Sequence, residues 1–172
     1  MVRAVPERVR WAVETLDVQP GDRVLEIGCG PGVAAALICE RLVDGEMLGI
    51  DRSPLQIERS QRRNEACVAS GRLRLAAVEL AELDAGEARF DKVFAIDVNV
   101  FWLGPAKKEL AAVREALAPD GRLFLFYAPP GPERARQAVE RVSAALRAEG
   151  FAAPEVLTRT PTLVCCVSGR QP

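Results

Sequence analysis

Apolar and polar residues follow two alternating patterns along the chain. Short runs rich in β-branched, aromatic and other apolar residues are typical of strands. Segments with apolar residues at three- and four-residue spacing are typical of amphipathic helices. The predicted strands are 23–27, 45–51, 72–77, 90–98, 122–127, 155–160 and 162–168, and the predicted helices are about 6–16, 33–42, 53–69, 105–117 and 132–150.

Strands that alternate with helices indicate a mostly parallel sheet with helices on both faces. Segment 122–127 is apolar almost throughout, as a strand buried on both faces should be. Only Pro161 separates the last two strands, which predicts a tight antiparallel pair. We therefore expect an α/β fold: a doubly wound, mostly parallel seven-stranded sheet with an antiparallel final hairpin strand. Residues 1–172 are expected to form one domain, with 1–20 as an N-terminal helical segment and candidate lid.

Two local signals refine these boundaries. Ser53, Pro54 and Gln56 have the order of a capping box, with serine as N-cap and proline at the first helical position. This box predicts one helix from residue 53 to about residue 69, stopped by Gly71. The sequence Pro119-Asp120-Gly121 predicts a turn before strand 122–127.

Charge and composition exclude several classes of function. The formal net charge is −1 and the basic residues are scattered among acidic ones, so nothing favours binding to nucleic acid or to an anionic membrane. No stretch has the length of a transmembrane helix, and the N-terminus lacks the apolar core of a signal peptide. Histidine is absent, which argues against a zinc site and against His-based nucleophilic catalysis. We therefore expect no metal and a cytoplasmic location.

The cysteines add little chemistry. There are five of them, Cys29, Cys39, Cys67, Cys165 and Cys166, and no two have CxxC spacing. The prediction is that they are buried, reduced thiols, as is usual in the cytoplasm.

The most informative stretch is VLEIGCGPG, residues 24–32, in which a predicted strand runs into Gly28, Gly30 and Gly32. In an open α/β sheet, ligands bind at the carboxyl ends of the strands, where this loop lies. Glycines allow close approach of a ligand to the backbone, and the following helix offers free N–H groups. A dinucleotide site of the form GxGxxG is the alternative, but its third position here is Val33.

With Glu26, the stretch reads ExGxGxG and resembles the glycine loop of the class I S-adenosylmethionine-dependent methyltransferases. The resemblance covers about residues 24–127, and the two closing strands fit the seventh-strand insertion of that family. It implies S-adenosylmethionine as cofactor and S-adenosylhomocysteine as product. Independently, a carboxylate such as Asp51 suits two ribose hydroxyls, and carboxylates and aromatic rings suit a sulfonium cation.

The resemblance also implies roles for individual residues. The cofactor-binding set is Glu26, Gly28, Cys29, Gly30, Gly32, Asp51, Arg52, Glu79, Leu80 and Asp97. Asp97 and Asn99, expected on one side of a strand, are the candidates for acting on the methyl acceptor. Trp11, Trp102 and Tyr127 are candidates for contact with the acceptor, although each could equally be a core residue.

The predicted function is therefore methyl transfer to a small-molecule acceptor, which the sequence does not identify, and the oligomeric state is left open. Two alternatives stay open as well. One is a protein that binds the cofactor without turnover and acts through a partner. The other is a nicotinamide-dependent oxidoreductase.

Overall fold

The computed structural model describes residues 4–169. Its centre is a seven-stranded sheet in the order β3-β2-β1-β4-β5-β7-β6. The strands are β1 (Arg23–Ile27), β2 (Glu46–Asp51), β3 (Leu73–Ala77), β4 (Phe90–Ile96), β5 (Leu117–Tyr127), β6 (Glu155–Thr160) and β7 (Leu163–Gly169). The helices are α1 (Glu7–Leu16), α2 (Val33–Cys39), α3 (Pro54–Arg63), α4 (Glu65–Ala69), α5 (Val100–Leu103), α6 (Lys107–Ala116) and α7 (Pro132–Ala148), with a 3-10 turn η1 (Leu80–Glu82).

The topology confirms the predicted fold class. Strands β1 to β5 pair in parallel, whereas β7 lies antiparallel between β5 and β6. The hairpin from β6 to β7 turns at residues 161–162, as the position of Pro161 predicts. Because β1, β2, β3 and β4 all point the same way, their carboxyl ends meet at one edge of the sheet.

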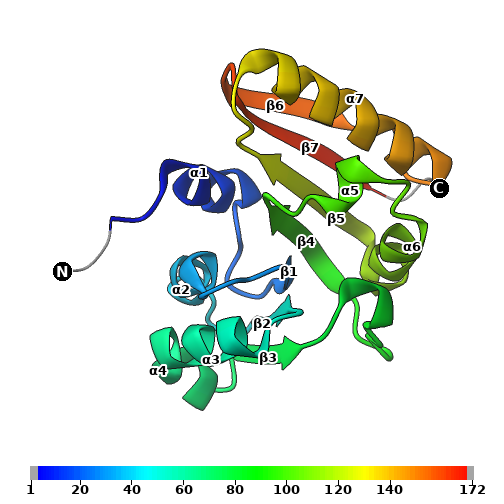
Figure 1. Ribbon diagram of the computed structural model, residues 1–172. Helices are drawn as coiled ribbons and strands as arrows, with labels where there is room; N and C mark the ends of the chain where they lie inside the picture. The colour runs from blue at the N-terminus through cyan, green and yellow to red at the C-terminus, as the bar shows by residue number, and fades with distance from the viewer. Residues whose placement is uncertain (1–3, 170–172) are drawn as a thin grey trace.

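Helices cover both faces of the sheet, as expected for alternating strands and helices (Figure 1). One core lies between the sheet and α1, α2 and α4, and contains Trp11, Ile38 and Phe126. The other core lies between the sheet and α5, α6 and α7, and contains Phe101 and Leu146. None of the helices within residues 4–169 is long and apolar enough to cross a membrane.

Three local expectations are wrong. The predicted helix 53–69 is two helices, α3 and α4, that meet at Asn64, whose side chain donates to the carbonyl oxygens of Ser60 and Gly32. Ser53 is the N-cap and Pro54 begins α3, as predicted, but the side-chain hydrogen bond of a capping box does not form, and the Ser53 N–H donates to Asp51. Strand β5 begins at Leu117, so the predicted turn at 119–121 lies inside an irregular part of β5.

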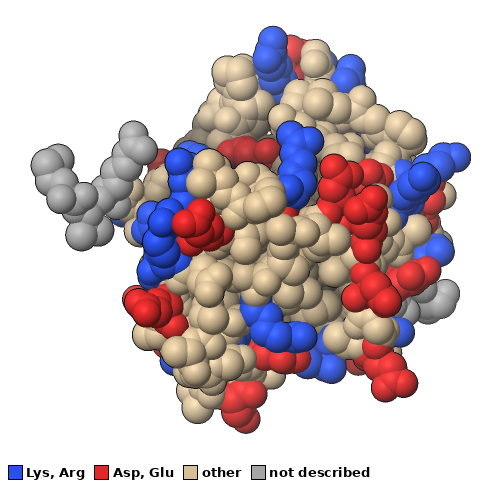
Figure 2. Space-filling model, turned by 60° about the horizontal axis from the view of Figure 1, so that its bottom comes forward, with Lys and Arg blue, Asp and Glu red and all other residues tan. Residues whose placement is uncertain are grey.

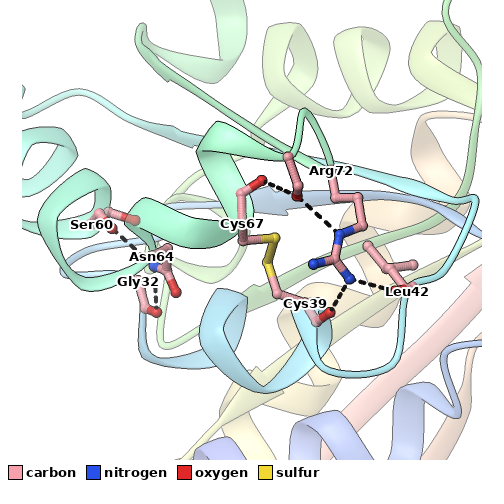
Figure 3. The surroundings of a disulfide bond; sticks show 8 residues. Gly32, Cys39, Leu42, Ser60, Asn64, Cys67 and Arg72 are labelled. Atoms are coloured by element: carbon pink, nitrogen blue, oxygen red, sulfur yellow. Dashed lines mark hydrogen bonds between the residues drawn. A yellow bond between two sulfur atoms is a disulfide. The ribbon is translucent and has the colours of Figure 1, made fainter.

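The prediction that all cysteines are reduced is also wrong. Cys39, the last residue of α2, forms a disulfide with Cys67 of α4, with 6.2 Å between their Cα atoms (Figure 3). Arg72 lies beside this bond and donates to the carbonyl oxygens of Cys39 and Leu42. The sequence spacing of 28 residues gave no signal, because the sulfur atoms meet only when α2 and α4 pack on the same face of the sheet. Cys29, Cys165 and Cys166 are free and buried, as expected.

The disulfide should stabilise the fold measurably. Closing a loop of this length removes chain entropy from the unfolded state, worth about 3–4 kcal/mol in the loop-closure model. We expect a reducing agent to lower the melting temperature by roughly 10 °C. The matched control is the Cys39→Ala/Cys67→Ala double variant, whose melting temperature should not respond to the reducing agent. Titration of five thiols instead of three in unfolded, unreduced protein would contradict the disulfide.

Candidate active site

A cavity lies at the carboxyl ends of the parallel strands, where the sequence places the glycine loop. Its volume is about 460 Å³. Loops that follow β1, β2, β3 and β4 contribute most of the wall, and α6 adds Glu109. The lining residues are Ile27, Gly28, Ile50, Asp51, Arg52, Val78, Glu79, Leu80, Ala81, Ile96, Asp97, Val98, Asn99, Val100 and Glu109.

Six of the predicted cofactor-binding residues line this cavity. Asp51 ends β2, and Glu79 and Leu80 follow β3. The remaining three are Gly28, Arg52 and Asp97. The other four predicted cofactor-binding residues do not line the cavity. They lie within or behind the glycine loop and are Glu26, Cys29, Gly30 and Gly32.

The carboxylate of Asp51 fixes the glycine loop to the end of β2. One of its oxygens accepts the N–H of Gly30 at 3.0 Å, and the other accepts the N–H of Ser53 at 2.9 Å. Each carboxylate oxygen has two lone pairs, so both retain an acceptor position for a ligand. Asp51 therefore shapes the loop and also offers acceptor capacity to the cavity.

Helix α3 and the residue after it hold the other end of the loop. Asn64 is buried, and its Nδ2 atom lies 3.1 Å from the Gly32 carbonyl oxygen (Figure 3). Arg63 donates through Nε to the carbonyl oxygen of Pro31 at 2.9 Å. A Cβ atom on Gly32 would collide with Ser60 and Asn64, whereas one on Gly30 would meet nothing within 4 Å. Gly32 is thus required by packing against α3, and Gly30 is not.

Glu26 is a buried acid beneath the loop. Its side chain has an unpartnered oxygen, Oε2, and the residue is only 4% exposed. Burial, together with the negative charge of Asp51, raises the pKa of Glu26 to about 8. The Oγ atom of Ser60 is also buried without a hydrogen-bond partner. The loop therefore covers buried polar atoms that the described residues do not satisfy.

A second set of polar groups lies where β4 and β5 end. Asp97 has φ +56° and has left β4, so it does not share a strand face with Asn99, contrary to the prediction. Its Oδ1 accepts the N–H of Ala128 at 2.8 Å, and its Oδ2 pairs with Nε of Arg8 at 3.0 Å. Asn99 precedes α5, and its Oδ1 accepts the indole N–H of Trp102.

Two of the aromatic candidates lie in the core. Trp11 is 8% exposed and packs edge-on against Phe126, with 5.4 Å between ring centroids. Tyr127 is 3% exposed, burial raises its pKa well above the usual value, and its hydroxyl donates to the carbonyl oxygen of Val98. Neither residue lines the cavity, and Trp102, which is half-buried, does not line it either. Cys29 is buried as well, which raises the pKa of its thiol to about 12.

The sequence analysis missed Arg8, Arg63, Asn64 and Glu109. Nothing in the sequence distinguishes Arg8 from the other arginines. It lies near the cavity only because α1 packs against β4 and β5, which brings Arg8 to Asp97 (Figure 1). Asn64 did carry a signal, because asparagine is a poor residue for a helix interior.

The charges on one face of the molecule are mixed. On the face drawn in Figure 2, Lys and Arg side chains lie among Asp and Glu side chains, and no continuous basic surface is present. This face therefore offers no electrostatic footprint for nucleic acid.

Comparison with known proteins identifies the family. Residues 24–121 match the family described as "Methyltransferase domain", which is more than half of the chain. The chain belongs to the class I S-adenosylmethionine-dependent methyltransferases. The matched segment begins with β1 and the glycine loop and includes the cavity-lining residues.

The methyltransferase has relatives of similar and of much greater length. It is 25% identical over 169 residues to YdaC of Bacillus subtilis (strain 168), an uncharacterized methyltransferase, covering 95% of this chain and 91% of that protein. It is 32% identical over 151 residues to trans-aconitate 2-methyltransferase of Methylobacterium radiotolerans, covering 84% of this chain and 52% of that protein. The chain spans only 32% to 39% of the length of three further curated relatives.

Solved structures agree on the fold of this methyltransferase. A SAM-dependent methyltransferase from Aquifex aeolicus superposes with a TM-score of 0.78 at 14% identity, covering 93% of this chain and 88% of that one. The pyocyanin biosynthetic protein PhzM superposes with a TM-score of 0.77 at 17% identity, covering 95% of this chain and 54% of that one.

The two glycines of the loop should respond differently to substitution. Gly32→Ala should lower the stability of the methyltransferase by about 1–3 kcal/mol more than Gly30→Ala, because its Cβ would be forced against the buried Ser60 and Asn64 side chains. Both glycines have positive φ, so both variants share the backbone strain of about 1 kcal/mol. Thermal unfolding of the two alanine variants without ligand checks this. Equal melting temperatures would contradict the packing role of Gly32.

Glu26 should make the stability depend on pH. Its pKa is raised from 4.5 to about 8, so the folded state binds more protons than the unfolded state between these values. The stability should therefore fall as the pH rises from about 4.5 to 8, by at most about 1.4 kcal/mol per pH unit. In Glu26→Gln this contribution is absent, so the variant should lose less stability than the wild type over that range. Urea unfolding at pH 5, 6.5 and 8 measures both; parallel pH profiles would contradict the role of Glu26.

Proposed function

We propose that this methyltransferase transfers the sulfonium methyl group of S-adenosylmethionine, in line, to a small organic acceptor at the β4–β5 end of the cavity. The observation that carries the proposal is the cavity itself. It combines a glycine loop after β1, the Asp51 carboxylate after β2 and Glu79 after β3 at one edge of the sheet. Family membership supports the same cofactor.

The residues present fit that cofactor. Asp51 has free acceptor positions for ribose hydroxyls, and Glu79 with the Leu80 N–H is suited to adenine. The unpartnered Oε2 of Glu26 is suited to an amino group, reached directly or through water. Gly28 and Gly30 keep the loop open for the methionine part, with Cys29 and Gly32 as its buried supports. When bound, S-adenosylmethionine supplies a methyl group on a positively charged sulfur.

Several features favour a small acceptor. The connection from β5 to α7 spans only residues 128–131, and the hairpin from β6 to β7 is equally short, so neither builds a large docking platform. Two relatives bear names that fit: trans-aconitate 2-methyltransferase and an O-methyltransferase of Pyrenophora dematioidea. A third, the ribosomal protein L11 methyltransferase of Ralstonia nicotianae, is named for a protein acceptor.

The chain's own residues contribute positioning more than acid–base chemistry. Asp97 is held by the Ala128 N–H and by an ion pair with Arg8, an arrangement that favours a positioning role over the role of a general base. Asn99 lines the cavity before α5, and its side chain holds Trp102, which lies outside the lining, through a hydrogen bond. Alignment of two reactants can lower a barrier by several kcal/mol without any proton transfer.

We also propose that the protein is located in the cytoplasm, where an enzyme acting on small molecules would meet its substrates. The Cys39–Cys67 disulfide argues for the other location, because disulfides persist mainly in oxidising compartments. Counting free thiols in freshly lysed, alkylated cells would discriminate the two.

Binding of the cofactor should depend on Asp51. Asp51→Asn keeps one side-chain acceptor but loses the charge, and should weaken binding of S-adenosylhomocysteine by about 10- to 100-fold. The matched control is Asp44→Asn. Asp44 is exposed and lies just before the start of β2, far along the strand from Asp51, so this variant should bind normally. Titration calorimetry measures both, together with NAD, which should not bind. Unchanged affinity in Asp51→Asn would move the ribose site elsewhere, and binding without transfer to any acceptor would favour the non-catalytic alternative.

A further inference from the structure

We propose that the methyl acceptor is a small carboxylic acid, that Arg8 binds it as its anion, and that a carboxylate oxygen receives the methyl group. This inference rests on the proposed function and adds the chemical class of the acceptor.

Arg8 is an anion-binding side chain that is held in position and is still free to bind. Its Nε atom pairs with Oδ2 of Asp97 at 3.0 Å, and Oδ1 of Asp97 is itself fixed by the Ala128 N–H. Within residues 4–169, the two terminal nitrogens of Arg8 make no hydrogen bond, and the side chain is 46% exposed. The planar guanidinium can therefore present N–H groups to a carboxylate, the geometry in which arginine binds most strongly.

Arg8 is not itself a lining residue, but its ion pair with Asp97 places it beside the β4–β5 end of the cavity. Helix α1 packs against β4 and β5, and Asp97, the partner of Arg8, is a cavity-lining residue (Figure 1). The acids proposed for ribose and adenine, Asp51 and Glu79, follow β2 and β3 on the other side of β1. An anion on Arg8 is thus placed at the β4–β5 end, apart from the groups assigned to the nucleoside.

The protonation chemistry points to the same class of acceptor. An alcohol, a phenol or an ammonium group must lose a proton to become a nucleophile, which requires a base. The chain has no histidine, Asp97 is paired with the Arg8 cation, and Tyr127 is buried. Glu79 and Glu109 line the opposite part of the wall, where α6 meets η1. A carboxylate is already ionised at neutral pH and needs no base.

The transfer is balanced without a further reactant. A lone pair of the carboxylate oxygen forms a bond to the methyl carbon as the bond from carbon to sulfur breaks. The electron pair of that bond stays on sulfur, so the sulfonium becomes the neutral thioether of S-adenosylhomocysteine. The products are a methyl ester and S-adenosylhomocysteine, and no proton changes place.

The first test measures binding of the acceptor without turnover. Protein saturated with S-adenosylhomocysteine is titrated with a panel of small mono-, di- and tricarboxylic acids that includes trans-aconitate, and with their neutral methyl esters. We expect at least one acid to bind more tightly than its ester. For that acid, Arg8→Gln should raise the dissociation constant by about 10- to 100-fold. Arg10→Gln, a change of an exposed arginine on the same helix, should leave it unchanged. Failure of every acid to bind overturns the inference.

The second test measures transfer with the acid that binds best. Wild-type protein should produce S-adenosylhomocysteine and a base-labile methyl ester in equal amounts. Arg8→Gln should raise KM far more than it lowers kcat, and Arg8→Lys should recover part of the loss. Turnover confined to phenols or amines, or an unchanged KM in Arg8→Gln, overturns the inference. Calorimetry with S-adenosylhomocysteine alone separates the two proposals: if wild-type protein does not bind it, the proposed function itself fails.

Discussion

The carboxylate of Asp51 is the interaction on which the proposed cofactor half of the site depends. It accepts one N–H from the glycine loop after β1 and another from the start of α3, and so ties two segments to the end of β2. A charged acceptor makes stronger hydrogen bonds than a neutral one. The same charge lies near Glu26 and adds to the cost of ionising it. The carboxylate that orders the loop therefore also favours the protonated form of the buried Glu26 side chain.

A second restraint acts on the loop from α3. Asn64 interrupts what would be one continuous helix, and its amide group is used to hold the carbonyl oxygen of Gly32. The disulfide between Cys39 and Cys67 connects the end of α2 to α4, on the same side of the sheet as Asn64 (Figure 3). The loop is therefore held at its middle by the Asp51 carboxylate and at its end by the Asn64 side chain. Such fixed geometry lowers the entropy that a ligand must lose on binding.

The proposed acceptor half is built differently. It depends on an ion pair between Arg8 and Asp97, both of which are close to half exposed, and on a hydrogen bond between Trp102 and Asn99. An exposed ion pair contributes little to stability, commonly less than about 1 kcal/mol. Arg8 and Asp97 are thus available for recognition at little cost to the fold. The two halves meet at β4, which lies beside β1 and β5 in the sheet.

Much of this protein follows from its sequence alone. Hydrophobic periodicity predicts the seven strands and the class of fold, because a sheet covered on both faces needs apolar strands and amphipathic helices in alternation. The ExGxGxG pattern and Asp51 locate the cofactor end, because the ends of consecutive parallel strands necessarily share one edge. The tertiary structure alone decides which residues far apart in sequence meet. It pairs Cys39 with Cys67 and Arg8 with Asp97, and it buries Trp11 and Tyr127 in the core. Each of these depends on how helices lie across the sheet, a packing relation that no local pattern of residues encodes.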